Sequence, residues 1–433
     1  MARAVGLTLL GLLAGCDDGG QPAKSVADQP AVCDPDDGSL VLPEGFCAMV
    51  VADNLGFVRH ITVAEDGTIY AALRNLRFDL GGILALKDST GNGRVDIVRE
   101  FADAPGMAIE IHDDWLYFGA DDAIYRYRLG QDLVPDGPGE VVVDGFPEQQ
   151  EHTGKTFTFD ERHNLYVNVG APSNACQEKN RQAGVPGLDP CPQLERHAGI
   201  WRFPADRTGQ RQADGERYAS GIRNAYALAW SRRAEALYAV QHGRDQLHEF
   251  WPGLFTQEQG ADQPAEQLLR IEAGGRYGWP YCYYDAEQQK LVLAPEYGGD
   301  GDAVGRCADY PSPLLGFPAH YSPNDMLFYE AEQFPEAFHD GAFIAFHGSY
   351  NRGDQGQVGY QVVFVPFADG KPTGDWEVFA DGFAGDSGHV ESPEDAEFRP
   401  TGLALGPDGA LYVSDSVQGR IWRITYIGKD GDA

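Results

Sequence analysis

One short pattern recurs along this chain and constrains its fold more than any other feature. An alternating apolar stretch is followed by a turn rich in Asp, Asn or Gly, and then by a second apolar stretch with an aromatic residue near its end. Alternation with period two on both sides of a short turn is typical of a β-hairpin with one buried face. Six copies occur, of which the fifth is the weakest: 61–70, 107–117, 157–166, 228–238, 326–346 and 403–412.

A lone hairpin is marginally stable in water, so the six hairpins must pack on one another. Six stacked units predict an all-β fold, a six-bladed β-propeller with four strands in each blade. The two longest gaps, 174–197 and 245–320, are expected to be insertions. Residues 41–51 precede the first unit and are expected to supply the strand that closes the ring on the last blade. We find no linker within 40–428 and predict one domain there.

The N-terminus predicts export. Residues 1–16 combine the charged Arg3, a short apolar run and a Leu-Ala-Gly-Cys sequence at 13–16 that is similar to a lipoprotein signal. Cys16 is then the lipidated first residue, and the polar segment 17–39 is a flexible tether. We expect an exported protein that is attached to a bacterial membrane only through this lipid, on its periplasmic or cell-surface side. The alternative is an ordinary secretory peptide with an incidental cysteine.

Cysteine usage agrees with an oxidising compartment. The chain has seven cysteines, and setting Cys16 aside for the lipid leaves an even number. No CxxC or CxxCH sequence occurs, so neither a thiol redox motif nor an attached haem is supported. Proximity along the chain favours three local disulfides: Cys33–Cys47, Cys176–Cys191 and Cys282–Cys307.

The charge balance excludes some partners. The 66 acidic and 33 basic residues give a net charge of −33, and no run of basic residues occurs. A nucleic-acid partner is therefore excluded, and attraction to anionic lipid is disfavoured. A well-solvated surface accounts for most of the acidic residues.

One acidic loop resembles a Ca²⁺-binding loop. Oxygen-bearing side chains alternate at Asp88, Thr90, Asn92 and Asp96, with a glycine at the expected place. The Glu that such loops carry at their last position is replaced by Arg99. A second Ca²⁺ site is therefore one interpretation of this loop, and a plain hairpin turn is the other.

Polar residues stand at similar offsets ahead of four inner strands. His152 and Arg223 lie five residues before their strands, Arg399 four before, and Arg59 two before. In a propeller, such residues emerge at one end of the central axis. Arg side chains bind carboxylates and His is the usual base near neutral pH, so this set predicts a site for a polyanion with a proton-transfer group. The alternative is that the arginines bind backbone carbonyls at the blade edges.

Two more stretches are expected at the same mouth. Residues 241–245 form a Gly-containing polar loop, whose backbone carbonyl oxygens suit a hard cation. Residues 347–352 contribute another histidine and arginine, His347 and Arg352.

At these residues the sequence resembles the glucose/sorbosone dehydrogenases that use pyrroloquinoline quinone (PQQ), including soluble aldose and pyranose dehydrogenases. The resemblance covers about residues 40–427. Residues 151–155 are similar to the segment that carries the family's catalytic histidine, and residues 345–352 are similar to its His-Gly-Ser-Trp-Asn-Arg motif. Residues 221–224 match its Gly-x-Arg-Asn motif, and residues 274–280 match its Gly-Gly-x-Tyr-Gly-Trp-Pro motif.

The resemblance implies a six-bladed propeller that binds PQQ and Ca²⁺ at its mouth. His152 would be the catalytic base, and the carbonyl oxygens of Gly243 and Arg244 would hold Ca²⁺. Together with the offset argument, it assigns cofactor binding to Arg59, Arg223, Asn224, His347, Arg352 and Arg399. Thr401 stands where the glucose branch has a second arginine, and that branch's cofactor-binding lysine is not evident. These departures favour a sorbosone or pyranose type.

The expected function is PQQ-dependent oxidation of an aldose or pyranose sugar, or of a sorbosone-like sugar aldehyde, to a lactone or acid. The small-molecule sugar is then the substrate, and an external electron acceptor, which the sequence does not identify, is a second partner. Two alternatives belong to other classes. A Ca²⁺-dependent lactonase-like propeller would place acidic metal ligands in the pore, and a binding propeller on the cell surface would carry no cofactor.

Overall fold

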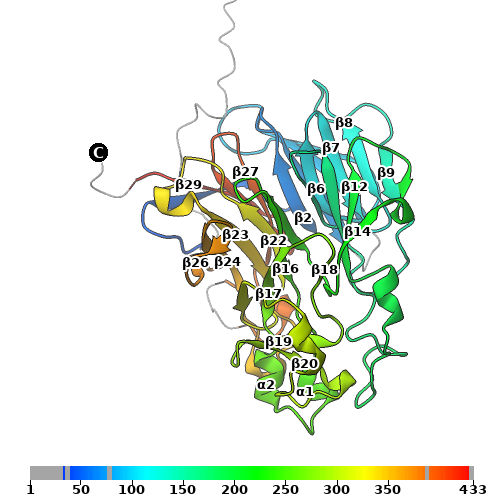
Figure 1. Cartoon of the computed structure of the whole chain (residues 1–433). Helices are drawn as coiled ribbons and strands as arrows, with labels where there is room; N and C mark the ends of the chain where they lie inside the picture. Colours follow the sequence, from blue (N-terminus) through cyan, green and yellow to red (C-terminus); the bar gives the residue numbers. More distant parts are fainter. Residues whose placement is uncertain (1–32, 35–39, 76–79, 386–389, 429–433) are drawn as a thin grey trace, which may run out of the picture.

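The chain folds as a six-bladed β-propeller in the computed structural model, which describes residues 33–34, 40–75, 80–385 and 390–428 (Figure 1). The predicted signal peptide with Cys16, and nearly all of the predicted tether, lie outside the described residues. Among the helices of the described ranges, none is both long and apolar enough to cross a membrane.

The first three blades follow one another along the chain, each an antiparallel sheet of four strands with the first strand at the axis. Blade 1 consists of β2 (Val58–Val63), β3 (Ile69–Asn75), β4 (Leu80–Lys87) and β5 (Ile97–Phe101). Blade 2 consists of β6 (Gly106–His112), β7 (Trp115–Ala120), β8 (Ile124–Arg128) and β9 (Glu140–Asp144), with β13 (Gln210–Arg211) added in parallel. Blade 3 consists of β10 (Phe157–Phe159), β11 (Asn164–Val169), β12 (Gly199–Pro204) and β14 (Glu216–Ser220), with β18 (Gly275–Arg276) added in parallel.

The remaining blades complete the ring. Blade 4 consists of β15 (Ala227–Ser231), β16 (Ala236–Gln241), β17 (Glu266–Ile271) and β21 (Leu315–Phe317). Blade 5 consists of β22 (Pro323–Phe328), β23 (Gly341–His347), β24 (Tyr360–Ala368) and β26 (Glu377–Ala380), and β25 (Lys371–Pro372) also pairs with β24. Blade 6 consists of β27 (Pro400–Leu405), β28 (Leu411–Asp415), β29 (Ile421–Tyr426) and β1 (Phe46–Ala52).

The ring is closed by a strand from the other end of the chain. β1 pairs antiparallel with β29, with Phe46 opposite Tyr426, as predicted for the segment 41–51. Around the axis, the inner strands contact one another in the cyclic order β2, β6, β10, β15, β22 and β27. Each of the six recurring hairpins of the sequence therefore supplies the two inner strands of one blade.

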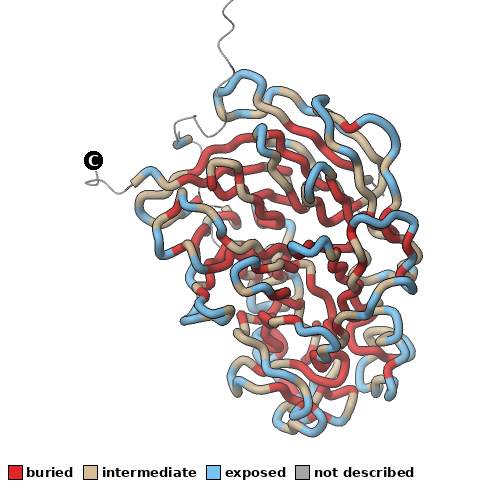
Figure 2. The backbone as a smooth tube through the Cα atoms, turned by 45° about the horizontal axis from the view of Figure 1, so that its top comes forward, coloured by how far each residue is buried: buried red, intermediate tan, exposed pale blue. Residues whose placement is uncertain are grey.

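The core lies between the blades rather than at one centre. Apolar side chains on both faces of each sheet pack against the neighbouring blades, which gives one hydrophobic cluster at each of the six blade interfaces. The buried backbone follows the sheets, whereas the connecting loops are exposed (Figure 2). Burial on both faces explains why the inner strands carry so few charged residues.

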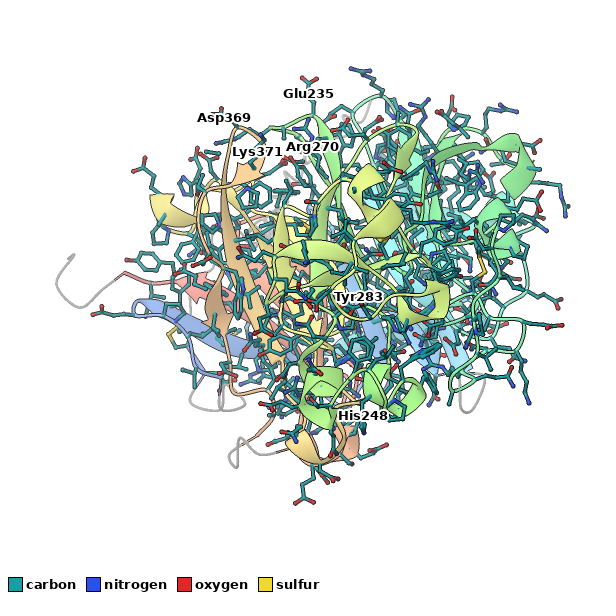
Figure 3. All side chains as sticks on the ribbon, turned by 60° about the horizontal axis from the view of Figure 1, so that its bottom comes forward. Glu235, His248, Arg270, Tyr283, Asp369 and Lys371 are labelled. Atoms are coloured by element: carbon teal, nitrogen blue, oxygen red, sulfur yellow. A yellow bond between two sulfur atoms is a disulfide. The ribbon has the colours of Figure 1, made fainter. Side chains whose placement is uncertain are left out.

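The two predicted insertions pack together beside one end of the ring (Figure 1). The prediction for 245–320 is wrong in part, because this segment also supplies β17 and β21 of blade 4 and the added strand β18 of blade 3. Outside the blades, the two segments contain α1 (Leu247–Phe250), α2 (Gln257–Asp262) and a hairpin of β19 (Cys282–Asp285) and β20 (Lys290–Leu293). Tyr283 of β19 packs in a small apolar cluster with Leu247, and Figure 3 shows Tyr283 and His248 from this side. All three predicted disulfides are confirmed: Cys33–Cys47, Cys176–Cys191 and Cys282–Cys307. The last two brace these insertions.

Candidate functional site

A cavity of about 280 Å³ opens at the end of the axis where the inner strands begin. The connections that lead into these strands, together with the ends of the second strands, place polar side chains around it. The structure brings together the residues that share an offset in the sequence, along with others that the sequence did not single out. The residues that line the cavity include Arg59, Arg74, His152, Arg223, His347 and Arg399.

His152 stands at this mouth in a defined orientation. Its Nδ1 lies 2.7 Å from the carbonyl oxygen of Ala171, and a carbonyl can only accept, so Nδ1 carries the proton. Nε2 has no hydrogen-bond partner among the described residues and keeps its lone pair. Burial, with Arg223 nearby, holds the pKa of His152 well below its usual range. The ring is therefore neutral near pH 7 and able to accept a proton.

The backbone that presents His152 is itself held in place. His152 adopts a left-handed conformation with φ of 53°, which an ordinary residue adopts only when its surroundings impose it. The side-chain Nε2 of Gln149 donates to the carbonyl oxygens of Glu151, His152 and Gly170, at 2.8, 2.8 and 3.2 Å. These three hydrogen bonds fix the loop and hence the direction of the imidazole.

Arg223 and Asp245 form a buried ion pair at the wall of the cavity, with 2.7 Å between Nη2 and Oδ2. Asp245 also accepts from Arg181 at 2.9 Å and from Nδ2 of Asn351 at 2.9 Å. Burial alone would raise the pKa of Asp245, but Arg223 and Arg181 lower it far below its usual range. Asp245 is therefore a permanent anion whose charge is already matched by two arginines.

The positive charge of Arg59 and Arg399 is not matched in this way. Among the described residues, neither guanidinium has a carboxylate within ion-pair distance, and that of Arg399 donates only to the backbone carbonyls of His347 and Gly348, each at 2.9 Å. The Nε atoms of Arg59 and Arg223 are buried without a partner. Burial and the neighbouring Arg74 lower the pKa of Arg59 to about 10. Such a cluster favours an anionic ligand, since buried charge is costly until it is paired.

Three further histidines line the cavity, His242, His320 and His347, and burial lowers the pKa of each. Nε2 of His242 donates to Pro323 O at 2.8 Å, its Nδ1 lies 3.2 Å from the side-chain amide of Asn224, and burial lowers its pKa to about 4. Nε2 of His347 lies 2.7 Å from the Ser416 hydroxyl, and burial, with Arg399, holds its pKa well below normal.

Asn224 does not line the cavity. It is fully buried and lies beneath the mouth, between His242 and Asn168. The structure therefore gives Asn224 a role in orienting His242, and contact with a bound cofactor stays a prediction.

The loop expected to hold a cation reaches the same cavity. Gly243 lines it, and its carbonyl oxygen accepts from Nη1 of Arg223 at 2.7 Å, which leaves one lone pair. Its N–H donates to Glu266 at 2.6 Å, and burial raises the pKa of Glu266 to about 8. The Arg244 side chain turns away to an ion pair with the buried Glu296. The backbone of this loop is thus fixed by Glu266 and Arg223, and cation binding there stays a prediction.

Two groups of predicted site residues lie outside the cavity. Arg352 donates to the Ala261 carbonyl and, at 2.9 Å, to Asp262, so its guanidinium is bound to α2. Asp88, Thr90, Asn92 and Asp96 lie in the loop between β4 and β5.

The carboxylates of that loop already have partners in the structure. Asp88 accepts from the backbone N–H groups of Thr90, Gly91 and Gly93, at 3.0, 2.7 and 2.6 Å. Asp96 accepts from the N–H and hydroxyl of Ser89, at 2.7 and 2.6 Å. The loop is thus closed by its own hydrogen bonds, and Ca²⁺ binding there stays a prediction.

The sequence analysis missed several residues of the mouth. Arg74 ends the second strand of blade 1 and pairs with Asp121 at 2.8 Å, and Asp245 and Glu266 were not singled out. A signal for Arg74 exists, because the end of a second strand lies at the same mouth as the start of the first. Asp245 had the same signal, because it follows closely after β16, the second strand of blade 4, which ends at Gln241. Glu266 lies within the long gap 245–320, where no repeated pattern marked it.

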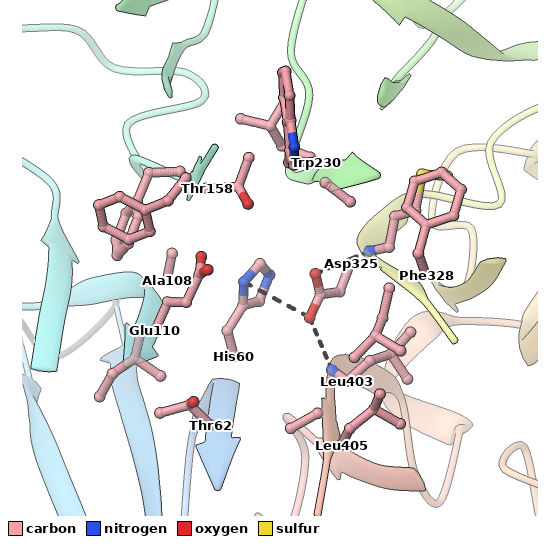
Figure 4. A pocket seen from close by; sticks show the side chains of 18 of the residues that line it. His60, Thr62, Ala108, Glu110, Thr158, Trp230, Asp325, Phe328, Leu403 and Leu405 are labelled. Atoms are coloured by element: carbon pink, nitrogen blue, oxygen red, sulfur yellow. Dashed lines mark hydrogen bonds and ion pairs between the residues drawn. The ribbon is translucent and has the colours of Figure 1, made fainter. Parts of the chain in front are cut away.

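A second cavity, of about 410 Å³, opens at the opposite end of the axis (Figure 4). His60 lies between Glu110 and Asp325 there; its Nε2 is 2.8 Å from Asn324 O, and its Nδ1 is 3.8 Å from Asp325. Asp325 accepts from the N–H of Leu403 at 2.8 Å, so this group joins β2, β22 and β27. The second cavity is larger, but the arginine that lines it, Arg232, lies 3.6 Å from Glu330, so this cavity lacks the unmatched positive charge of the first. Both ring nitrogens of its His60 lie near an oxygen atom, of Asn324 and of Asp325. The first cavity is the better candidate for chemistry.

Comparison with known proteins places the chain in a defined group. The TrAA12-like family model matches residues 40–427. The holo pyranose dehydrogenase PQQ domain from Coprinopsis cinerea is 19% identical, with a TM-score of 0.69 over 89% of this chain and 97% of that one. The calcium structure of a Trichoderma reesei carbohydrate-active enzyme of family AA12 is 19% identical, with a TM-score of 0.71 over 90% and 97%.

A curated relative has no stated activity. An uncharacterized protein of Borreliella burgdorferi is 22% identical over 401 residues, which are 90% of this chain and 91% of that protein. The structural likeness confirms the predicted six-bladed fold, and the family match confirms the resemblance drawn from the sequence motifs.

Proposed function

Because this chain belongs to the TrAA12-like family, we propose that it is a PQQ-dependent dehydrogenase that oxidises a sugar at the mouth of the propeller. The proposed substrate is an aldose, a pyranose or a sorbosone-like sugar aldehyde, and the product is a lactone or acid. A similar structure carries the description of a pyranose dehydrogenase PQQ domain, which supports this choice.

The observation that carries the proposal is the unmatched positive charge around His152. PQQ bears three carboxylates, and the mouth offers Arg59 and Arg399 without acidic partners, and Arg223 with a buried, unpaired Nε. Arginine binds carboxylates with paired, charge-assisted hydrogen bonds. The residues present therefore fit a polyanionic cofactor of this kind. When bound, PQQ would supply the two-electron oxidant that takes a hydride from the substrate carbon.

His152 supplies the base. Its Nδ1–H is held by Ala171, which leaves the Nε2 lone pair free on a residue that lines the cavity. It would take the proton from a sugar C1 hydroxyl, or from the hydrate of an aldehyde, as the substrate loses its hydride. The low pKa of His152 keeps this nitrogen unprotonated at neutral pH. The reducing equivalents then leave to an external acceptor.

Ca²⁺ is proposed at the loop that carries Gly243. The carbonyl oxygens of Gly243 and Arg244 are hard ligands of the kind that Ca²⁺ prefers. Glu266 orients this loop by accepting the Gly243 N–H, and Arg223 occupies one lone pair of its carbonyl oxygen. A similar structure is described as a calcium form, which supports the presence of this ion.

We also propose that the chain is exported and lipid-anchored through Cys16. The three disulfides support an oxidising compartment, where such bonds persist.

A reconstitution experiment tests the proposed activity. The purified chain is incubated with PQQ, with and without Ca²⁺, and the bound quinone is followed by absorbance. A panel of aldoses, pyranoses and sugar aldehydes is then tested with an artificial electron acceptor. Quinone binding with sugar-dependent dye reduction is expected. Lactone hydrolysis that needs Ca²⁺ and no quinone would instead support a lactonase. If the chain neither binds quinone nor hydrolyses lactones, a binding propeller without a cofactor would be supported.

A further inference from the structure

Three metal-ligating side chains meet at the end of the propeller opposite the proposed active site. His112 ends β6, Asp113 follows it in the turn to β7, and His163 lies in the turn between β10 and β11. The β6–β7 turn belongs to blade 2, and the β10–β11 turn belongs to the neighbouring blade 3. Phe159, which lines the second cavity, stacks on His112, so the cluster lies at the rim of that cavity.

The ligand atoms are spaced as a metal ion requires. Nε2 of His112 lies 3.0 Å from Nδ1 of His163, and Oδ2 of Asp113 lies 3.8 Å from the first and 3.3 Å from the second. A point about 2.0 Å from all three atoms satisfies these separations, and about 2.0–2.1 Å is the length of a Zn–N or Zn–O bond. In the structure these two nitrogens share a hydrogen bond, which a bound ion would replace.

The cluster is ordered by its surroundings and open on one side. The His112 ring stacks on Phe159 with 4.1 Å between ring centroids and 10° between planes, which fixes the direction of Nε2. The side chain of His112 is only 19% exposed, whereas those of His163 and Asp113 are 57% and 62% exposed. A bound ion would have free coordination positions toward solvent.

The donor set indicates the class of metal. Imidazole nitrogens suit Zn, Cu, Fe and Ni, whereas Ca²⁺ and Mg²⁺ prefer all-oxygen sites. We propose that His112, Asp113 and His163 bind one divalent transition-metal ion, which joins the β6–β7 turn of blade 2 to the β10–β11 turn of blade 3. The two histidines are 51 residues apart in sequence, so the ion would tie together blades that are otherwise joined here by side-chain packing. This proposal does not depend on the proposed oxidation, because the site lies at the other end of the axis.

Zn²⁺ binding to the metal-stripped full chain tests the proposal. Titration against a chromogenic chelator is expected to show one Zn²⁺ per chain at this site, and added Zn²⁺ should raise the melting temperature. His163→Asn and Asp113→Asn should each weaken this binding by at least about tenfold, in line with the loss of a metal ligand. Both side chains are largely exposed, so these variants are expected to fold. Added Ca²⁺ or Mg²⁺ should not compete.

A matched control and a spectroscopic readout separate this site from other histidines. His248→Gln removes a histidine whose Nδ1 binds the Phe255 carbonyl at 2.8 Å, and it should bind Zn²⁺ as the unaltered chain does. Cu²⁺ in place of Zn²⁺ should show electron paramagnetic coupling to two imidazole nitrogens, and to only one in His163→Asn. If the unaltered chain binds no Zn²⁺, or if both ligand variants bind it with unchanged affinity, the proposal is wrong.

Discussion

The imidazole of His152, which lines the mouth, donates through Nδ1 to the carbonyl oxygen of Ala171 at 2.7 Å, which leaves Nε2 as the ring nitrogen with a lone pair. The N–H of Ala171 in turn donates to the carbonyl oxygen of Arg223 at 2.6 Å. One backbone residue therefore sets both the tautomer of the proposed base and its placement relative to the arginine beside it. The proposed roles of His152 as base and of Arg223 in cofactor binding can therefore be tested separately.

Replacing His152 by alanine should remove the proposed base without reducing the binding of PQQ. Turnover in the PQQ-reconstituted protein should fall by about 10²–10⁴-fold, the usual contribution of a general base. Bound quinone, measured by absorbance in the same samples, should stay near its original level because the arginines remain. Loss of quinone with full turnover at saturating PQQ would contradict this assignment of roles.

Replacing Arg59 by glutamine should have opposite effects on the empty and the loaded protein. The empty protein should become more stable, with a melting temperature higher by about 1–3 °C, because a buried charge without an acidic partner is removed. PQQ affinity should fall by about 10- to 100-fold, the value of one hydrogen bond to a charged group.

Arg223→Gln is the informative comparison for Arg59. It also weakens PQQ retention, but it leaves Asp245 in a buried site with one arginine fewer, so the empty protein should be destabilised by about 3–5 kcal/mol. Thermal unfolding of both apo variants measures this contrast. A fall in melting temperature for Arg59→Gln would mean that its charge is already compensated.

Arg352 provides a test of where the cofactor site ends. Its guanidinium binds Ala261 and Asp262 on α2 rather than the cavity. Arg352→Gln should therefore change PQQ affinity by less than about threefold, whereas a contact with a carboxylate would be worth about tenfold or more. Equilibrium titration with PQQ distinguishes the two results, and a large loss would restore the assignment made from the sequence.

Glu110 should make stability depend on pH at the opposite end of the axis. Burial, with Asp325 nearby, raises its pKa to about 8 from 4.5. The folded protein then keeps a proton that the unfolded chain has lost, so the stabilisation is complete below pH 4.5 and disappears as the pH rises through about 8. Melting temperatures measured from pH 5 to 9 should fall less steeply in Glu110→Gln. Parallel curves for the two proteins would contradict the raised pKa.

The lipid anchor is tested at Cys16, which lies outside the described residues. Cys16→Ser removes the thiol that would carry the lipid, so the protein should move from the membrane fraction to the soluble fraction. Fractionation followed by immunoblotting measures the shift. Equal membrane partition of both proteins would show that another feature holds the chain there.

The sequence by itself determined the fold class, because hairpin periodicity is a local property. Each of the six repeated units carries its own alternation and turn, and one face of every hairpin must be buried by a neighbour. The number of units therefore predicted the number of blades, and the phase of His152, Arg223 and Arg399 ahead of their strands predicted a shared mouth. The disulfides could also be predicted from the sequence, because each joins cysteines that are close along the chain.

Only the tertiary structure decided which of the candidate side chains face the cavity. Asn224 and Arg352 belong to matching motifs, yet one is buried beneath the mouth and the other binds α2. The direction of a side chain depends on partners far along the chain, as with Asp245, whose carboxylate is neutralised by Arg181 from another insertion. The cluster of His112 and His163 has the same origin, since two turns 51 residues apart meet only when neighbouring blades pack. Contacts of this kind depend on blade packing, which no local pattern encodes.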